Sequence, residues 1–301
     1  MTRFIPYGLV WLVMWGVSVV PAEAQTLLRW KFKSGDVFRL TMIQETTTTM
    51  QFGAQPVDTN LVLTVDSVWT VGKVDPQAGA EITQTVPRMR MKMASPLIGG
   101  SDVDTDSPGE SANPMAKALK QFTTARFSFQ MSPAGEISNI KVTDAAGKPM
   151  AAEGPVGQIL GKDGIANMVK QTTFALPKQA VRLGETWQQS LNIEVPMLGT
   201  MKADTTLTYQ GPAQAEGKML QAIGTETTTS IAQNAGGNRL PQLNITEQSD
   251  KGTMYFDNQA GRFSHAESTQ NMKLQLMVAG QTVEQTVKTV RKAQLAPAAP
   301  Q

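Results

Sequence analysis

The chain has 301 residues, of which 41% are hydrophobic and 17% are charged, and its formal net charge is +2. This near-neutral charge gives no support to binding of nucleic acid or of a strongly anionic membrane surface. Because the chain contains no cysteine, disulfides, a thiolate nucleophile and cysteine-based metal sites are excluded. Its stability must therefore come from burial of an apolar core.

Residues 1–24 have the layout of a secretory signal peptide. Arg3 precedes an apolar stretch from Tyr7 to Val20, and an A-x-A site ends at Ala24. The apolar stretch is shorter than the ~20 residues of a membrane-spanning helix, so we expect cleavage before Gln25 rather than retention as an anchor. The sequence thus predicts an exported protein of the periplasm or extracellular space, with no membrane span after cleavage.

Alternation of apolar and polar residues dominates a first β region, which we place at residues 25–153. From Phe38 to Phe52 the even positions are apolar at both ends and the odd positions are mostly polar, which indicates a long strand. The central run Thr46–Thr49 fits this strand, because β-branched residues favour an extended backbone and two threonines then face each way. Two further alternating runs, 60–71 and 80–93, predict an antiparallel meander.

Helical patterns are short and few. A helix is predicted at about 114–122, where Asn113 is a suitable N-cap and Pro114 suits the first helical position. Residues 154–180 are predicted to connect two β regions and to contain further short helices at about 155–172, interrupted by glycine.

The strand pattern restarts in a second β region at residues 181–292, and a Pro- and Ala-rich tail at 293–301 is predicted to be disordered. Gly35-Asp36-x-Phe38 opens the first region and Gly184-Glu185-x-Trp187 opens the second. This weak repeat leaves open whether the halves are a true structural duplication. The predicted fold is mainly β, with long antiparallel strands in two related curved sheets or half-barrels and short helices between them.

The single histidine, His265, is the first candidate for catalysis. Alternation places it on the same side of a strand as Glu267, and a histidine–carboxylate pair can act as a general base. However, Ser264 would lie on the opposite face, and the chain contains no G-x-S-x-G elbow. We therefore favour a surface histidine beside a carboxylate, with a hydrolase as a remote alternative.

Asp102, Asp104 and Asp106 recur at every second position and, together with Glu110, are weak candidates for calcium ligands. The glycine and glutamate that an EF-hand loop needs at its sixth and twelfth positions are missing. We therefore predict a solvated acidic loop without a metal. The chain also shows no phosphate loop or dinucleotide fingerprint, so no cofactor is predicted.

Methionines and phenylalanines are the candidates for a ligand cavity. Met89, Met91 and Met93 share one face of RMRMKM, and the three cations share the other. Phe127 and Phe129 alternate in the hairpin that follows the predicted helix. Such adaptable and aromatic side chains can line an apolar pocket, or they can simply fill a core.

Four stretches carry a resemblance to a known family: LRWKFKSGDVFRLTMIQETTTTM, DTDSP…ANPMAKALKQFTTARFSFQMSPAGEISNI, VRLGETW and KGTMYFDNQAGRFSHAESTQNMKLQL. They resemble an uncharacterised family of exported proteins of unknown function that is common in planctomycete-type bacteria. The shared features are strands, turns and a helix rather than catalytic signatures. The resemblance implies an exported, cysteine-poor, β-rich protein and transfers no functional residues.

Together these features predict a non-enzymatic exported envelope protein that binds an apolar or amphipathic small molecule, such as a lipid, between sheet and helices. The alternative is a structural or protein-interaction module whose exposed strand edges pair with an envelope protein.

Overall fold

The structure is a computed structural model that describes residues 25–52, 55–97, 99–107, 114–149, 174–195, 199–232, 242–278 and 281–298. The predicted signal peptide at 1–24, the predicted helices at about 155–172 and the candidate Glu110 lie outside the described residues. Within the described ranges, no helix is both long enough and apolar enough to cross a membrane.

Twelve antiparallel strands in these ranges form a single sheet. The strands of the N-terminal half are β1 (Val37–Phe52), β2 (Gln55–Asp75), β3 (Gly79–Ser95), β4 (Gly99–Asp104), β5 (Arg126–Met131) and β6 (Ile137–Thr143). Those of the C-terminal half are β7 (Thr186–Val195), β8 (Gly199–Ala215), β9 (Lys218–Ala232), β10 (Gln242–Asp257), β11 (Arg262–Val278) and β12 (Gln281–Pro297). The long alternating runs of the sequence are therefore confirmed as strands.

The order of the strands is β6-β5-β3-β2-β1-β12-β11-β10-β9-β8-β7, and β4 pairs with the second half of β3. β1 and β12 pair along most of their length, from Phe38↔Pro297 to Met50↔Gln285. This pairing joins the two halves into one sheet, so the prediction of two related sheets is wrong. Alternation along a strand shows its two faces but not its neighbour, and for this reason the pattern could not show that the two terminal strands pair.

The C-terminal tail requires a second correction. Residues 293–301 were expected to be disordered, but β12 extends to Pro297 and Leu295 on it is buried. Leu295 lies opposite Leu40 of β1, and the Ala298 amide donates to the Val37 carbonyl at 2.9 Å. A composition rich in proline and alanine does not show whether another strand is available for pairing. A prediction from composition therefore underestimates how ordered this segment is.

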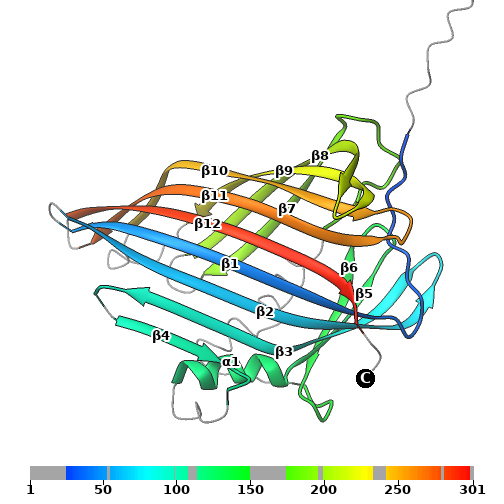
Figure 1. Cartoon of the computed structure of the whole chain (residues 1–301), viewed down its shortest axis with the longest axis horizontal. Coiled ribbons are helices and arrows are strands. Elements are labelled where there is room, and N and C mark those ends of the chain that lie inside the picture. The colour runs from blue at the N-terminus through cyan, green and yellow to red at the C-terminus, as the bar shows by residue number, and fades with distance from the viewer. Residues whose placement is uncertain are drawn as a thin grey trace, which may run out of the picture.

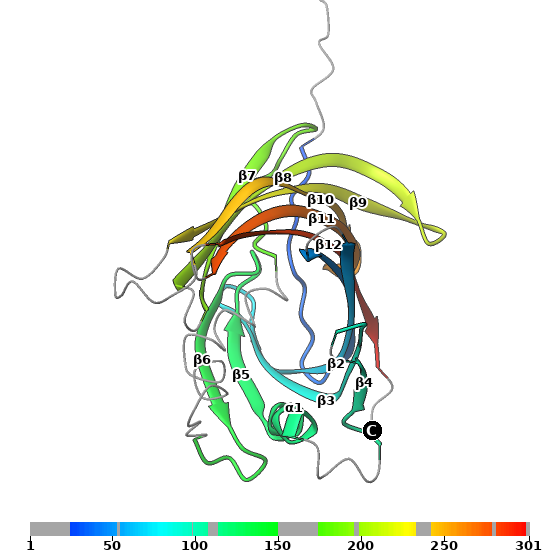
Figure 2. The same ribbon diagram turned by 90° about the vertical axis from the view of Figure 1, so that its left-hand side faces the viewer.

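The sheet curls into an open half-barrel, with β6 and β7 as its two edges (Figure 2). The helix predicted at about 114–122 is present as α1 (Pro114–Thr124), which lies beside β3 and β4 (Figure 1). The apolar residues Ala116 and Leu119 of α1 pack with Val103 and with Met89 and Met91 of β3. The helix thus covers part of the inner face of the sheet.

The segment 25–33, here called the N-terminal strap, crosses one end of the half-barrel (dark blue in Figure 1). The Thr26 amide donates to the Val181 carbonyl at 2.8 Å near the β7 edge, and the Trp30 amide donates to the Pro133 carbonyl at 2.8 Å in the β5–β6 turn. The Lys31 amide donates to the Gly261 carbonyl in the β10–β11 turn at 2.8 Å. The strap therefore ties together turns from both halves of the sheet.

An aromatic cluster fills the strapped end. Trp30 stacks on Phe32 with ring centroids 6.1 Å apart and meets Phe256 edge-on at 5.7 Å. Trp69 meets Phe129 edge-on at 6.1 Å. Four of these rings belong to the main buried core and Phe32 packs against it, so this end of the half-barrel is packed with side chains rather than hollow.

Candidate functional site

A pocket of about 560 Å³ lies on the inner face of the half-barrel, beyond the aromatic cluster. Strands β1, β2 and β7 to β12 contribute to its walls, and Phe174 contributes from the segment that precedes β7. Its size falls in the usual range for small-molecule sites. Residues that are paired across neighbouring strands form rows, and these rows arrange the pocket lining across the sheet.

The lower row, next to the aromatic cluster, is apolar. Met42 lies opposite Ala293, Ala293 opposite Ala266, and Ala266 opposite Met254. Directly opposite residues in an antiparallel sheet share a face, so these four side chains form one strip across β1, β12, β11 and β10. With the nearby Phe263 and Phe174, this strip forms an apolar floor for the pocket.

The next two rows are polar, and we call them the polar belt. The first row of the belt runs across β1, β12, β11 and β9 and contains Gln44, Arg291, Ser268 and Thr225. The second row runs from β1 to β7 and contains Thr46, Thr289, Gln270, Asp250, Thr227, Thr205 and Gln189; Thr46 and Thr289 continue the row beyond the residues that line the pocket. Gly252 lies between Ser268 and Thr225, where an added Cβ would be only 2.6 Å from the Ser268 Cβ.

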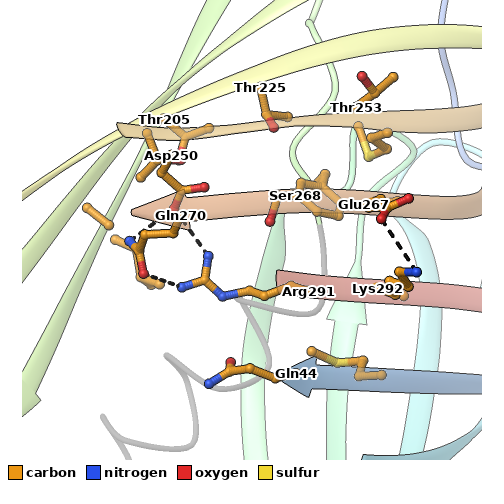
Figure 3. Close-up of a pocket in the computed structure, with 18 of the residues that line it drawn as sticks. Gln44, Thr205, Thr225, Asp250, Thr253, Glu267, Ser268, Gln270, Arg291 and Lys292 are labelled. Carbon is orange, nitrogen blue, oxygen red and sulfur yellow. Dashed lines mark hydrogen bonds and ion pairs between the residues drawn. The ribbon is translucent and has the colours of Figure 1, made fainter. Parts of the chain in front are cut away.

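An ion pair occupies the centre of the polar belt (Figure 3). Arg291 Nη1 donates to Asp250 Oδ2 at 3.1 Å, and Arg291 Nη2 donates to Gln270 Oε1 at 2.8 Å. Gln270 Nε2 in turn donates to Asp250 Oδ2 at 3.1 Å. The three side chains therefore form a closed network that connects β10, β11 and β12.

Asp250 is the most buried charged group of the belt, with only 8% of its surface exposed. Burial raises the pKa of the Asp250 carboxyl, and Arg291 opposes that rise by attracting and hydrogen-bonding its charged form. Arg291 is more open, with 39% of its side chain exposed. The guanidinium thus faces the pocket while its carboxylate partner lies deeper in the wall.

Hydroxyl pairs extend the belt on both sides of this network. Thr46 and Thr289 are 3.2 Å apart between their Oγ1 atoms, and Thr205 and Thr227 are 2.8 Å apart. Beyond the belt, on the side away from the aromatic cluster, the lining becomes mainly apolar again, with Met272, Leu191, Met201 and Ala203. Leu63 of β2 lies opposite Gln44, at the β2 end of the first row of the belt. The pocket is therefore apolar next to the aromatic cluster, polar in the belt, and largely apolar on the far side of the belt.

The five residues predicted to line a cavity do not line this pocket. Met89 and Met91 pack against α1 and its neighbours, and Phe127 and Phe129 are buried in the main core. Met93 lies on the same face of β3, opposite Leu61 of β2. The sequence shows that these side chains point inward, but only the fold shows that core and helix already occupy their positions.

Arg291 and Asp250 were missed by the sequence analysis, although β12 carries a signal for one of them. Val283, Val287 and Arg291 share a face of this strand, so Arg291 is a charge on an otherwise uncharged face. Asp250 gives no comparable signal, because it lies between Ser249 and Lys251 in a polar stretch.

His265 and Glu267 lie on the same side of β11, as predicted, but the register places them on the face opposite to the belt. His265 Nδ1 is 3.7 Å from Glu216 Oε2, and its ring stacks on Tyr255 with centroids 4.5 Å apart. Glu267 instead forms an ion pair with Lys292, with 3.5 Å between Glu267 Oε1 and Lys292 Nζ. Each of the two candidates therefore has a different charged neighbour.

The aspartates of the acidic loop are used in ion pairs. Arg88 Nη2 is 2.6 Å from Asp104 Oδ2, and Arg90 Nη2 is 2.7 Å from Asp102 Oδ2. Hydrogen bonds from these arginines hold the pKa of each carboxyl below its usual value. Asp106 Oδ2 is 3.9 Å from Arg88 Nε. In the part of the chain that the structure describes, no group of three or more metal-ligating side chains is found.

A model of the family described as "Family of unknown function (DUF6263)" matches residues 77–263, which is more than half of the chain. The chain belongs to this family. No curated protein matches it. The bacterial distribution and the export that the sequence resemblance implies stay predictions.

Several solved structures match this chain over most of its length. An outer membrane channel from Pseudomonas putida F1 is 8% identical, with a TM-score of 0.27 over 89% of this chain and 97% of that chain. DynF from the dynemicin biosynthesis pathway of Micromonospora chersina is 10% identical, with a TM-score of 0.26 over 93% and 92%. The translocator domain of the autotransporter NalP from Neisseria meningitidis is 8% identical, with a TM-score of 0.21 over 88% and 90%. Likeness at this level supports no conclusion about function.

Proposed function

We propose that this member of the DUF6263 family is an exported protein of the cell envelope that binds an amphipathic small molecule inside its half-barrel. The observation that carries the proposal is the pocket of about 560 Å³, whose apolar floor is separated from an apolar upper wall by the polar belt. Export is supported by the leader-like residues 1–24.

The layout of the pocket favours a ligand with both apolar and polar parts. Burial of apolar ligand surface against Met42, Met254 and Phe263 supplies affinity, at roughly 25 cal/mol per Å². The buried polar groups of the belt would lose hydrogen bonds to water if a purely apolar molecule covered them. An amphipathic ligand avoids this cost because its polar part can satisfy the belt.

A pair of alanines on β12 allows a sharp test. Ala293 lies on the pocket floor, whereas Ala296 is exposed on the opposite face of the same strand. The Ala293→Phe change should fill the floor and weaken binding of the apolar fluorescent dye N-phenylnaphthylamine by roughly tenfold, equivalent to ~1.4 kcal/mol. The Ala296→Phe change adds the same ring outside and should leave the affinity within about twofold.

Thermal unfolding of both variants checks that the fold is retained, because an overpacked core is itself destabilising. If the dye does not bind the wild-type protein, or binds a folded Ala293→Phe variant as well as the wild type, the proposed pocket is wrong. If the dye behaves as expected, native mass spectrometry of protein purified from its own periplasm would identify the natural occupant of the pocket.

The alternative of a protein-interaction module is supported by a different observation. Among the described residues the sheet is not closed, so β6 and β7 each have one edge without a neighbouring strand in the sheet order. Such edges can pair with a strand of another protein. Crosslinking in cells through a photoreactive residue at Gln188 of β7 should then trap a specific envelope protein, and the absence of any adduct would contradict this alternative.

A further inference from the structure

The charges of the polar belt cancel each other. Arg291 and Asp250 are its charged members, and they are joined by a direct ion pair at 3.1 Å. The other two charged residues that line the pocket, Glu267 and Lys292, are on the opposite face of their strands by register and pair with each other. The inner face at the pocket therefore presents a belt without net charge.

The remaining groups of the belt are suited to a neutral partner. Ser268, Thr225, Thr227 and Thr205 carry hydroxyls, each of which can donate one hydrogen bond and accept others by rotating. Arg291 uses two of its N–H groups toward Asp250 and Gln270, and a guanidinium has five. The belt thus offers both donors and acceptors over a short distance.

A ligand with a net charge would be poorly matched to this arrangement. A carboxylate that approached Arg291 would also approach Asp250, and an ammonium that approached Asp250 would also approach Arg291. Either ion would have to leave water for a largely apolar pocket without a counter-charge of its own, and that desolvation is costly. A hydroxyl-bearing head group has no such cost and can still bond to the threonines.

We propose that the polar belt selects amphipathic molecules whose head group is uncharged and bears hydroxyls, such as long-chain alcohols or acylglycerols, and discriminates against their anionic and cationic counterparts. This inference rests on the proposed function of the pocket. It further assigns the selection to the closed Arg291–Asp250–Gln270 network, because that network holds the cation and the anion of the belt together.

Three probes of equal chain length test the selection. Dodecanol, kept below its solubility limit, and dodecanoate and dodecylammonium, kept below the concentrations at which they form micelles, are allowed to displace N-phenylnaphthylamine from the wild-type protein at neutral pH. Dodecanol should bind roughly tenfold more tightly than either ion. If none of the three displaces the dye, the proposed function fails; if dodecanoate or dodecylammonium binds as tightly as dodecanol, only the selection by the belt is wrong.

Charge variants then locate the origin of the selection. Asp250→Asn keeps the size of the side chain but leaves Arg291 without its counter-charge, so dodecanoate should become the tightest of the three probes. Adding Arg291→Gln to this variant should restore the preference for dodecanol, because the belt is again neutral. The readout is a ratio of affinities for one protein sample, so a partial loss of folded protein does not change it.

Lys288 provides the matched control, since it is three residues before Arg291 on β12, its exposed side chain is on the opposite face by register, and it does not line the pocket. Lys288→Gln removes the same charge as Arg291→Gln but should leave the wild-type ranking of probes unchanged. A ranking that changes equally with Lys288→Gln would show that overall charge, not the belt, controls selection. An Asp250→Asn protein that still prefers dodecanol would overturn the role of the ion pair.

Discussion

The strongest test of the fold concerns two adjacent leucines of the N-terminal strap. Leu28 is completely buried in the main core, whereas Leu27 is 50% exposed. Leu28→Ala removes three carbon atoms from the core, which costs about 2.4 kcal/mol at ~0.8 kcal/mol per carbon. The cavity that remains adds to this cost, so the free energy of unfolding should fall by about 3–4 kcal/mol.

Leu27→Ala is the matched control, because it makes the same chemical change one residue earlier. Its side chain is half in water already, so the expected loss is below about 1 kcal/mol. Urea denaturation followed by tryptophan fluorescence measures both values on the chain that starts at Gln25. If the two variants lose the same stability to within about 0.5 kcal/mol, the strap is not part of the core and the description of the strapped end is wrong.

Two further predictions concern a turn and an ion pair. Gly79→Ala should destabilise the protein by several kcal/mol, because an added Cβ would lie 2.0 Å from the Met131 carbonyl oxygen and φ is +101°. At Gly35, where φ is +87°, an added Cβ would have no atom of the described residues within 4 Å apart from its chain neighbours, so Gly35→Ala should cost only about 1–2 kcal/mol. Equal losses of the two variants in urea denaturation would contradict this reasoning. The hydrogen bond from Arg88 lowers the pKa of Asp104 in the folded state, so its stabilising effect is present above the usual carboxyl pKa and is lost as the pH falls through the lowered value. Asp104→Asn should therefore reduce the acid sensitivity of unfolding relative to wild type, and an unchanged pH profile of the melting temperature would refute the assignment.

The run Thr46–Thr49 shows what the alternation of side chains along one strand can predict. The sequence predicts that its threonines face both ways, and the structure agrees with this prediction. Thr46 lies within 3.2 Å of Thr289 in the polar belt, while Thr47 donates to Asn60 and Thr49 to Asp58. Side-chain direction is a local property of an extended chain, so one strand contains enough information to show it.

The candidate site required information that no single strand contains. Arg291 and Asp250 are 41 residues apart in the chain, and they meet because β11 lies between their strands in a defined register. A shift of one residue in either pairing would turn one of these side chains to the other face. Likewise, Met89 and Phe127 point inward as predicted, but α1 and the aromatic cluster decide that they are core rather than cavity.

The sequence by itself determined the class of fold, the approximate extent of most strands, the helix at α1 and the inner and outer face of β1. These features follow from the spacing of apolar residues and from backbone preferences, both of which act over a few residues. Only the tertiary structure decided that β1 pairs with β12, that the strap closes one end, and that polar residues from seven strands align as a belt. These features depend on contacts between distant parts of the chain, whose alignment emerges when the whole sheet packs around one core.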